Sequence, residues 1–132
     1  MKQRIYIDTS VVGGFFDEEF KNPTQQLFKR LENDEVKFVV SDLLELELLQ
    51  APKQVSDLLL SYPNDRFERV ELTEETMILA DRYIAEKVVG RTSLEDCRHI
   101  ALATINRVDV LVSWNFKHIV NLDRIKGYNS VI

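Results

Sequence analysis

The chain has 132 residues, of which 45% are hydrophobic and 30% are charged, and its formal net charge is −5. This length predicts one domain over residues 1–132 and is too short for two. The composition is ordinary for a globular protein, and the negative charge excludes an overall basic surface, although local Lys and Arg side chains can still contact nucleic acid.

The cysteine content and the lengths of the apolar runs indicate the compartment. The single cysteine, Cys97, excludes an internal disulfide framework, and its place in a predicted helix favours a small buried thiol over a nucleophile. No apolar run approaches the roughly 20 residues of a membrane span, and the N-terminus lacks the apolar core of a secretory signal. We therefore expect a soluble, cytoplasmic protein with no membrane partner.

Apolar runs alternate with helical patterns along the chain. The first run predicts a buried strand over residues 3–8 that ends on Asp8, and Gly13 and Gly14 are expected to relax a tight turn after it. The elements expected next are a helix at 23–31 capped by Asn22 with Pro23 in its first position, a strand at 36–41, helices at 43–49 and 52–60, and a strand at 67–72.

The second half continues the alternation. Its expected elements are a helix at 74–87 capped by Thr73 and broken at Gly90, a helix at 94–106 capped by Ser93, a strand at 109–114, a short helix at 116–120 and a strand at 129–132. Strands that alternate with helices predict an α/β fold whose sheet is mostly parallel and covered by helices on both faces.

Acidic and amide side chains stand where the strands are expected to end or the helices to begin. Asp8 ends the first strand, and Asn115 follows the fourth. Glu95 and Asp96 lie in the first turn of the helix at 94–106. Ligands of open α/β sheets bind at the carboxyl edge of the strands, so these positions favour a functional site.

The helix after the second strand carries two further candidates, Glu45 and Glu47. Residues two apart on a helix point about 200° away from each other, so only one can face a given site, and the periodicity leaves the choice open. Each acid also has a purely structural explanation. Asp8 can cap a turn, first-turn acids stabilise a helix dipole, a helix glutamate can be solvated, and Asn115 can cap a helix.

Four short motifs span nearly the whole chain. They are Ile5-Tyr6-Ile7-Asp8-Thr9-Ser10, Val39-Val40-Ser41 leading to Glu47-Leu48, Glu95-Asp96-Cys97-Arg98-His99-Ile100-Ala101-Leu102-Ala103, and Leu111-Val112-Ser113-Trp114-Asn115-Phe116-Lys117-His118-Ile119. In this order and spacing they resemble the PIN-domain ribonucleases, especially the VapC-like toxins of bacterial toxin–antitoxin pairs. The resemblance implies a PIN-like three-layer sandwich, a metal-dependent endoribonuclease, an RNA substrate, a cognate antitoxin and a homodimer.

The resemblance also selects the site residues. It implies that Asp8, Asp96 and Glu47, rather than Glu45, hold Mg²⁺ or Mn²⁺ at the carboxyl edge of the sheet. A hard cation there would relieve the repulsion between the acids and activate water for phosphodiester hydrolysis. Around this centre we expect three further roles: Thr9 and Ser113 support the acids, Asn115 positions water or substrate, and Arg98 and Lys117 contact phosphates.

One departure from the family pattern weakens the catalytic expectation. Many members carry a fourth acid just after the strand expected at 109–114, where this chain has Asn115 and His118. Asn can coordinate through its carbonyl oxygen but brings no charge, and the role of His118 is open. The alternative is a catalytically impaired PIN-like module that binds RNA or protein. The remaining histidine, His99, lies in its helix at a spacing typical of core residues, and its side chain is expected to pack in the core.

Overall fold

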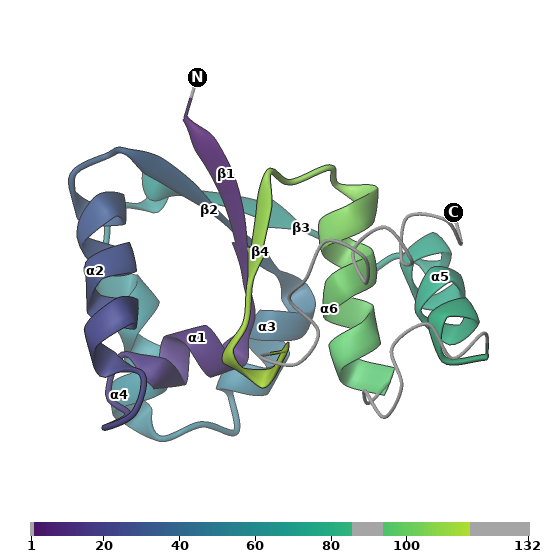
Figure 1. Ribbon diagram of the computed structural model, residues 1–132, viewed down its shortest axis with the longest axis horizontal. Coiled ribbons are helices and arrows are strands. Elements are labelled where there is room, and N and C mark those ends of the chain that lie inside the picture. Colours follow the sequence, from purple (N-terminus) through teal and green to yellow (C-terminus); the bar gives the residue numbers. More distant parts are fainter. Residues whose placement is uncertain (1, 86–93, 117–132) are drawn as a thin grey trace.

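A computed structural model of the chain describes residues 2–85 and 94–116. At its centre lies a sheet of four parallel strands in the order β3-β2-β1-β4 (Figure 1). The strands are β1 (Gln3–Ile7), β2 (Val36–Ser41), β3 (Phe67–Val70) and β4 (Val110–Val112). Because they run in the same direction, their carboxyl ends meet at one edge of the sheet. The prediction of an α/β fold with a parallel sheet is confirmed.

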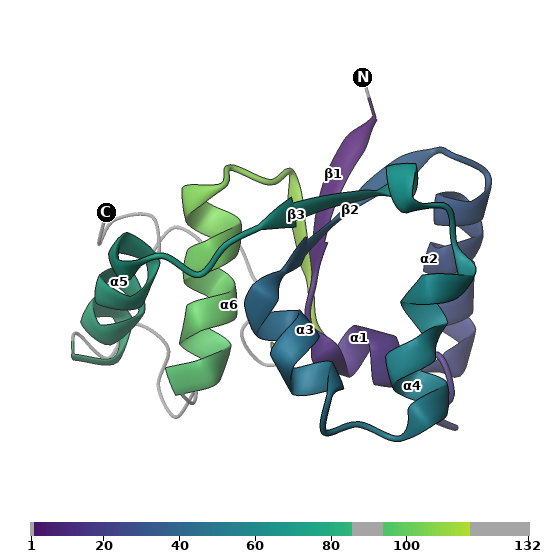
Figure 2. The same ribbon diagram turned by 180° about the vertical axis from the view of Figure 1, so that it is seen from behind.

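Helices cover both faces of this sheet, as predicted. The α-helices in the described ranges are α1 (Thr9–Gly14), α2 (Lys21–Glu32), α3 (Asp42–Leu48), α4 (Lys53–Leu58), α5 (Glu74–Ala85) and α6 (Leu94–Ile105). Short 3-10 helices lie at η1 (Leu59–Ser61), η2 (Asn64–Arg66) and η3 (Trp114–Phe116). Figures 1 and 2 show α1, α2 and α4 on one side of the sheet and α6 on the other, with α5 packed outside α6.

The alternation of side chains along the strands produces these layers. In β1, Ile5 and Ile7 are buried in a core shared with Phe28 of α2. Tyr6, between them, points to the opposite face and is buried in a core with Leu102 of α6. A strand buried on both faces has a continuous apolar sequence, which is why this run could be predicted.

Helix α1 replaces the tight turn that was expected after β1. Asp8 caps this helix by accepting a hydrogen bond from the Val11 N–H at 3.3 Å. Gly13 and Gly14 therefore end a helix, and neither has a positive φ. Gly14 serves a close approach instead, because a Cβ there would lie 2.6 Å from Nε1 of Trp114.

Helix α2 begins earlier than predicted. It starts at Lys21 after Phe20, and not at Pro23 after an Asn22 cap. Asp17 organises this start, because its Oδ1 accepts two backbone N–H groups of the next turn at 2.8 and 3.3 Å. Pro23 is tolerated as the third helical residue, since first-turn N–H groups have no partner within the helix.

The other predicted elements in the described ranges lie close to their expected bounds. Thr73 caps α5 as predicted, accepting a hydrogen bond from the Thr76 N–H at 3.2 Å. The predictions for residues 86–87, Gly90, Ser93, 117–120 and 129–132 fall outside the described residues. None of the described helices is long and apolar enough to cross a membrane.

Candidate active site

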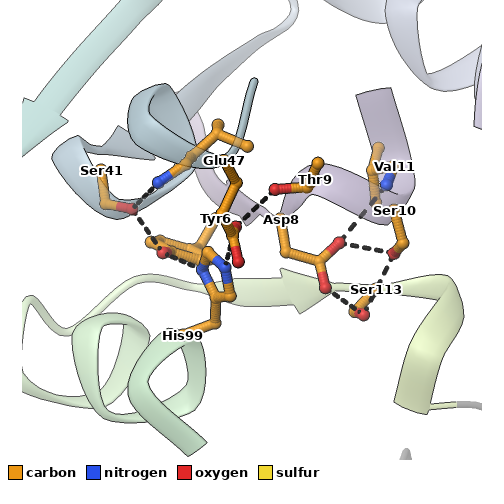
Figure 3. Close-up of polar contacts among 10 residues, drawn as sticks. Tyr6, Asp8, Thr9, Ser10, Val11, Ser41, Glu47, His99 and Ser113 are labelled. Carbon is orange, nitrogen blue, oxygen red and sulfur yellow. Dashed lines mark hydrogen bonds and ion pairs between the residues drawn. The ribbon is translucent and has the colours of Figure 1, made fainter. Parts of the chain in front are cut away.

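Asp8 lies at the carboxyl end of β1, where it also caps α1 (Figure 3). Its Oδ1 accepts hydrogen bonds from Ser10 Oγ at 2.6 Å and from the Val11 N–H, and its Oδ2 accepts one from Ser113 Oγ. Ser113 follows β4, the strand beside β1. Asp8 is only 1% exposed, so these three donors take the place of water around its carboxylate.

Burial raises the pKa of Asp8 above its usual range, and the hydrogen bonds from Ser10 and Ser113 offset only part of this effect. A carboxylate has about four acceptor positions, and the three donors leave one of them on Oδ2. A cation at this oxygen would favour the charged form of the buried group. The capping explanation of Asp8 is thus correct, and it is compatible with a role as a metal ligand.

Glu47 reaches the same edge of the sheet from the neighbouring strand. Ser41 ends β2 and caps α3 by accepting the Leu44 N–H at 3.1 Å, and Glu47 lies in the second turn of that helix. Its Oε1 accepts a hydrogen bond from Thr9 Oγ1 at 2.5 Å. Since Thr9 directly follows Asp8 in the chain, this contact brings the two carboxylates to the same part of the edge (Figure 3).

Glu45 faces elsewhere. It pairs with Arg69 on the surface, with 3.2 Å between Oε1 and Nε, and both side chains are about half exposed. Glu45 and Glu47 are two residues apart on α3, so their side chains point in different directions. The choice that periodicity left open is therefore made by the fold, and it is Glu47 that lies beside Thr9 and Asp8.

His99 links Glu47 to the interior of the sheet (Figure 3). Its Nε2 lies 2.7 Å from Glu47 Oε1, and its Nδ1 lies 2.6 Å from the Tyr6 hydroxyl. Tyr6 in turn lies 2.9 Å from Ser41 Oγ. When His99 carries its proton on Nε2, Ser41 donates to the Tyr6 hydroxyl, Tyr6 donates to His99 Nδ1, and His99 Nε2 donates to Glu47.

The polar role of His99 was missed by sequence reasoning. His99 is 2% exposed, as its expected packing requires, but both ring nitrogens make hydrogen bonds. The available signal was its spacing, because His99 lies three residues after Asp96 and therefore on the same face of α6.

These hydrogen bonds also set the charge of Glu47. Burial would raise the pKa of this carboxyl, but the hydrogen bonds from His99 and Thr9 outweigh it and hold the pKa below its usual range. Among the described residues, Oε2 of Glu47 accepts no hydrogen bond. Oε2 of Glu47 and Oδ2 of Asp8 therefore keep acceptor positions, and carboxylate oxygens are hard ligands that suit a divalent cation.

The third acid is less closely joined to this pair. Asp96 is half-buried in the first turn of α6, one turn before His99. Within residues 2–85 and 94–116, no group of three or more His, Cys, Asp or Glu side chains is arranged to hold a metal ion. The structure thus brings Asp8 and Glu47 together, whereas the addition of Asp96 stays a prediction.

Two expected supporting residues contact the acids, Thr9 at Glu47 and Ser113 at Asp8. Their roles in function stay predictions. Asn115 is exposed in η3, where its backbone N–H donates to Ser113 Oγ at 3.1 Å.

The remaining candidates lie on or beyond α6. Arg98 is half-buried, and its Nε has no hydrogen-bond partner among the described residues. Lys117 and His118 lie outside the described residues. Cys97 is buried as predicted, and burial raises the pKa of its thiol to about 11, which disfavours a nucleophilic thiolate.

Comparison with known proteins identifies the fold. No family model and no curated protein matches the sequence. Among solved structures, the chain matches the Mycobacterium tuberculosis toxin VapC20, which cleaves the sarcin–ricin loop, with a TM-score of 0.68 and 11% identity. This match covers 90% of the present chain and 97% of VapC20.

Two further structures are similar. One is a chain of a toxin–antitoxin complex from Klebsiella pneumoniae, with a TM-score of 0.60, 18% identity, and 91% and 93% of the two chains covered. The other is a chain of VapBC2 from Rickettsia felis bound to a DNA fragment from its promoter, with a TM-score of 0.59, 14% identity, and 91% and 96% covered. The expected PIN-like fold of the VapC toxins is therefore confirmed.

Proposed function

We propose that the protein is a metal-dependent endoribonuclease that hydrolyses RNA phosphodiester bonds and acts as the toxin of a toxin–antitoxin pair. The observation that carries this proposal is the pair of carboxylates, Asp8 and Glu47, at the carboxyl edge of a parallel sheet. The shared fold with VapC20, a toxin that cleaves the sarcin–ricin loop, supports RNA as the substrate class. The cytoplasm, where such RNA is found, is the proposed location.

In this mechanism, Asp8, Glu47 and Asp96 hold Mg²⁺ or Mn²⁺. A bound ion of this kind lowers the pKa of bound water and polarises the phosphate. The chain's own residues orient the ligands: Ser10 and Ser113 hold Asp8, and Thr9 and His99 hold Glu47. The proposed contacts to water and RNA come from Asn115, Arg98 and Lys117.

Cleavage of single-stranded RNA tests this proposal. The wild-type protein is incubated with the RNA in Mg²⁺, in Mn²⁺ and in EDTA, beside Asp8→Asn and the control Asp65→Asn, whose carboxylate is 78% exposed. We expect cleavage by the wild type and Asp65→Asn with metal only, and none by Asp8→Asn. Full activity of Asp8→Asn, or a rate that is the same in EDTA, would contradict the proposal.

A catalytically impaired PIN-like module that binds RNA or protein is the second candidate. It is favoured by Asn115 in the place of an acid, and by the absence of a three-ligand metal group within the described ranges. Such a module would bind RNA without cutting it and would gain no thermal stability from Mn²⁺. Growth arrest on expression, cured by co-expression of a gene encoded beside it, would instead support the toxin.

The proposed partners are a cognate antitoxin and a second copy of the chain. The helices at 43–60 and 74–87 could supply a dimer face or belong to the core, and in the structure these segments have buried residues and also exposed apolar ones. The exposed ones are Leu46 at 62%, Leu49 at 75%, Leu60 at 80%, Ile78 at 54% and Ile84 at 39%. Light scattering after size-exclusion chromatography tests the homodimer, and a mass of 15.4 kDa would contradict it.

A further inference from the structure

A cavity of about 500 Å³ lies beside Ser10, which donates a hydrogen bond to Asp8, and its volume is within the size range of small-ligand sites. The described residues that line it come from α1, the segment between α1 and α2, and η3. They are Ser10, Gly13, Gly14, Asp17, Phe20, Trp114 and Asn115. Asn115 is proposed to contact water or RNA, but none of these residues is a proposed metal ligand, so the cavity needs an explanation of its own.

Ser10 joins the cavity to the candidate active site. Its Oγ donates to Oδ1 of Asp8 at 2.6 Å and accepts the Trp114 N–H at 2.9 Å. Ser113, the residue before Trp114, donates to the other oxygen of Asp8. A ligand in the cavity therefore lies one side chain away from the proposed metal ligand.

The aromatic wall of the cavity is flat and held in place. Phe20 and Trp114 stack in parallel, with ring centroids 5.2 Å apart and an interplanar angle of 7°. Trp114 Nε1 donates to Thr24 Oγ1 at 3.0 Å, and Gly14 leaves the space that this indole edge occupies. Fixed aromatic faces of this kind are the surfaces on which single-stranded nucleic acids stack their bases.

Asp17 supplies a fixed acceptor at the same cavity. Its Oδ1 is held by two backbone N–H groups, while Oδ2 accepts no hydrogen bond among the described residues. A carboxylate repels phosphate but accepts N–H groups from a base edge. Oδ2 keeps its two acceptor positions, and among the four RNA bases guanine alone presents two adjacent N–H donors on its Watson–Crick edge.

We propose that this cavity binds the base of the nucleotide next to the scissile phosphate, stacked against Phe20 and Trp114 and read by Asp17, with guanine preferred. This inference rests on the proposed function, because it places the base beside the active site of a ribonuclease. The base is favoured over an apolar peptide side chain, because Asp17 places an acceptor for base N–H groups beside the aromatic wall.

Trp114 gives a direct readout, since it is the only tryptophan of the chain. The NMR signal of its indole N–H is followed during titration with GMP, AMP, CMP and UMP in EDTA, with ribose 5-phosphate as the base-free control. We expect a saturable shift with the nucleotides, strongest binding of GMP, and no shift with ribose 5-phosphate. Equal shifts with ribose 5-phosphate, or none with any nucleotide, would overturn the proposal.

Matched variants separate the cavity from its surroundings. Phe20→Leu is expected to weaken GMP binding about tenfold, whereas Phe16→Leu, on an exposed ring outside the cavity, leaves it unchanged. Asp17→Asn should lose the preference for GMP, whereas Glu18→Gln, whose carboxylate is 92% exposed, should keep it. Equal effects within either pair would contradict the proposal.

Filling the cavity gives an independent test. A Cβ on Gly13 meets nothing within 4 Å, so Gly13→Leu is expected to keep the fold and block the nucleotides. Retained GMP binding by folded Gly13→Leu would overturn the assignment of the cavity. These titrations are made in EDTA, so they measure base binding independently of metal-dependent cleavage. Base binding by a protein that does not cleave RNA when Mg²⁺ or Mn²⁺ is added would refute the proposed function but not the base site. Cleavage without base binding would refute only the site.

Discussion

The two carboxylates of the candidate site are held in opposite ways. Asp8 is fully buried, is bound by two serine hydroxyls and a backbone N–H, and has its pKa raised by burial. Glu47 is partly exposed, is bound by Thr9 and His99, and has its pKa lowered by those hydrogen bonds.

This difference shows how a fold can place two acids together without metal. One acid is fixed by neutral donors and loses solvation, so it is the one that gains most from a cation. The other keeps its charge because His99 and the residues behind it, Tyr6 and Ser41, orient their donors toward it. Substitutions on the Asp8 side and on the Glu47 side should therefore have different effects.

The largest effect is expected within α3. Glu47→Gln removes a charge from the proposed metal site, and it should lower the rate of RNA cleavage about 100-fold. Glu45→Gln removes the same charge two residues away, where it pairs with Arg69 on the surface, and should leave the rate unchanged. Steady-state cleavage assays compare the two variants, and similar losses would show that the helix contributes through its overall charge.

His99→Gln tests the positioning of Glu47. It should weaken Mn²⁺ binding about tenfold, measured by titration calorimetry, because Glu47 loses its donor from the interior. The control is Ile100→Val, the next buried residue of α6, which should cost about 1 kcal/mol of stability and leave Mn²⁺ binding intact. Unchanged Mn²⁺ affinity in His99→Gln would reduce the histidine to a packing residue.

The packing of α1, the helix that Asp8 caps, is tested at its two glycines. Gly14→Ala should destabilise the protein by about 1–3 kcal/mol, because its Cβ would lie 2.6 Å from Nε1 of Trp114 and 2.9 Å from Thr24 Oγ1. Gly13→Ala should stabilise it by about 0.5–1 kcal/mol, since the helix gains an alanine and the Cβ meets open space. Denaturant unfolding compares them, and a shift of the same sign in both would contradict this picture of α1.

The smallest effects concern stability in acid, measured in EDTA. A lowered pKa means that folded Glu47 binds its proton less tightly than the unfolded chain, so its contribution is present above pH 4.5 and is lost as the pH falls through the folded pKa. Asp8 has the opposite sign, because its raised pKa makes the charged form costly as the pH rises above 3.8.

Glu47→Gln should therefore flatten the loss of stability on acidification, and Asp8→Asn should steepen it. The free energy of unfolding is measured at each pH between 3 and 7 by urea titration. If the two variants changed the slope in the same direction, the proposed contrast between the two carboxylates would be wrong.

Much of the fold followed from local patterns. Buried strands such as β1 have continuous apolar sequences, and Ser41 and Thr73 cap the helices that were expected after them. Helix α1 escaped prediction because two glycines near its end are typical of a turn. Gly14 is explained by its close approach to Trp114 and Thr24, and Trp114 is distant in sequence.

The candidate site was predictable only in part. The positions of Asp8 and Glu47 followed from strand ends and from the family resemblance, and the fold makes the choice between Glu45 and Glu47. The contacts of His99 join α6 to β1 and α3, and pairings between residues so far apart in the chain leave no local pattern. The same holds for the stacking of Phe20 on Trp114.

The most direct test of the account is the binding of Mn²⁺ by Asp8, Glu47 and Asp96, followed as the shift in Tm of the apo protein. The wild type and Asp65→Asn should gain stability as Mn²⁺ is added, in proportion to the logarithm of its concentration above Kd. Asp8→Asn, Glu47→Gln and Asp96→Asn should each lose most of that gain. Equal shifts in Tm for all five proteins, or none in the wild type, would contradict the convergence of these acids on one ion.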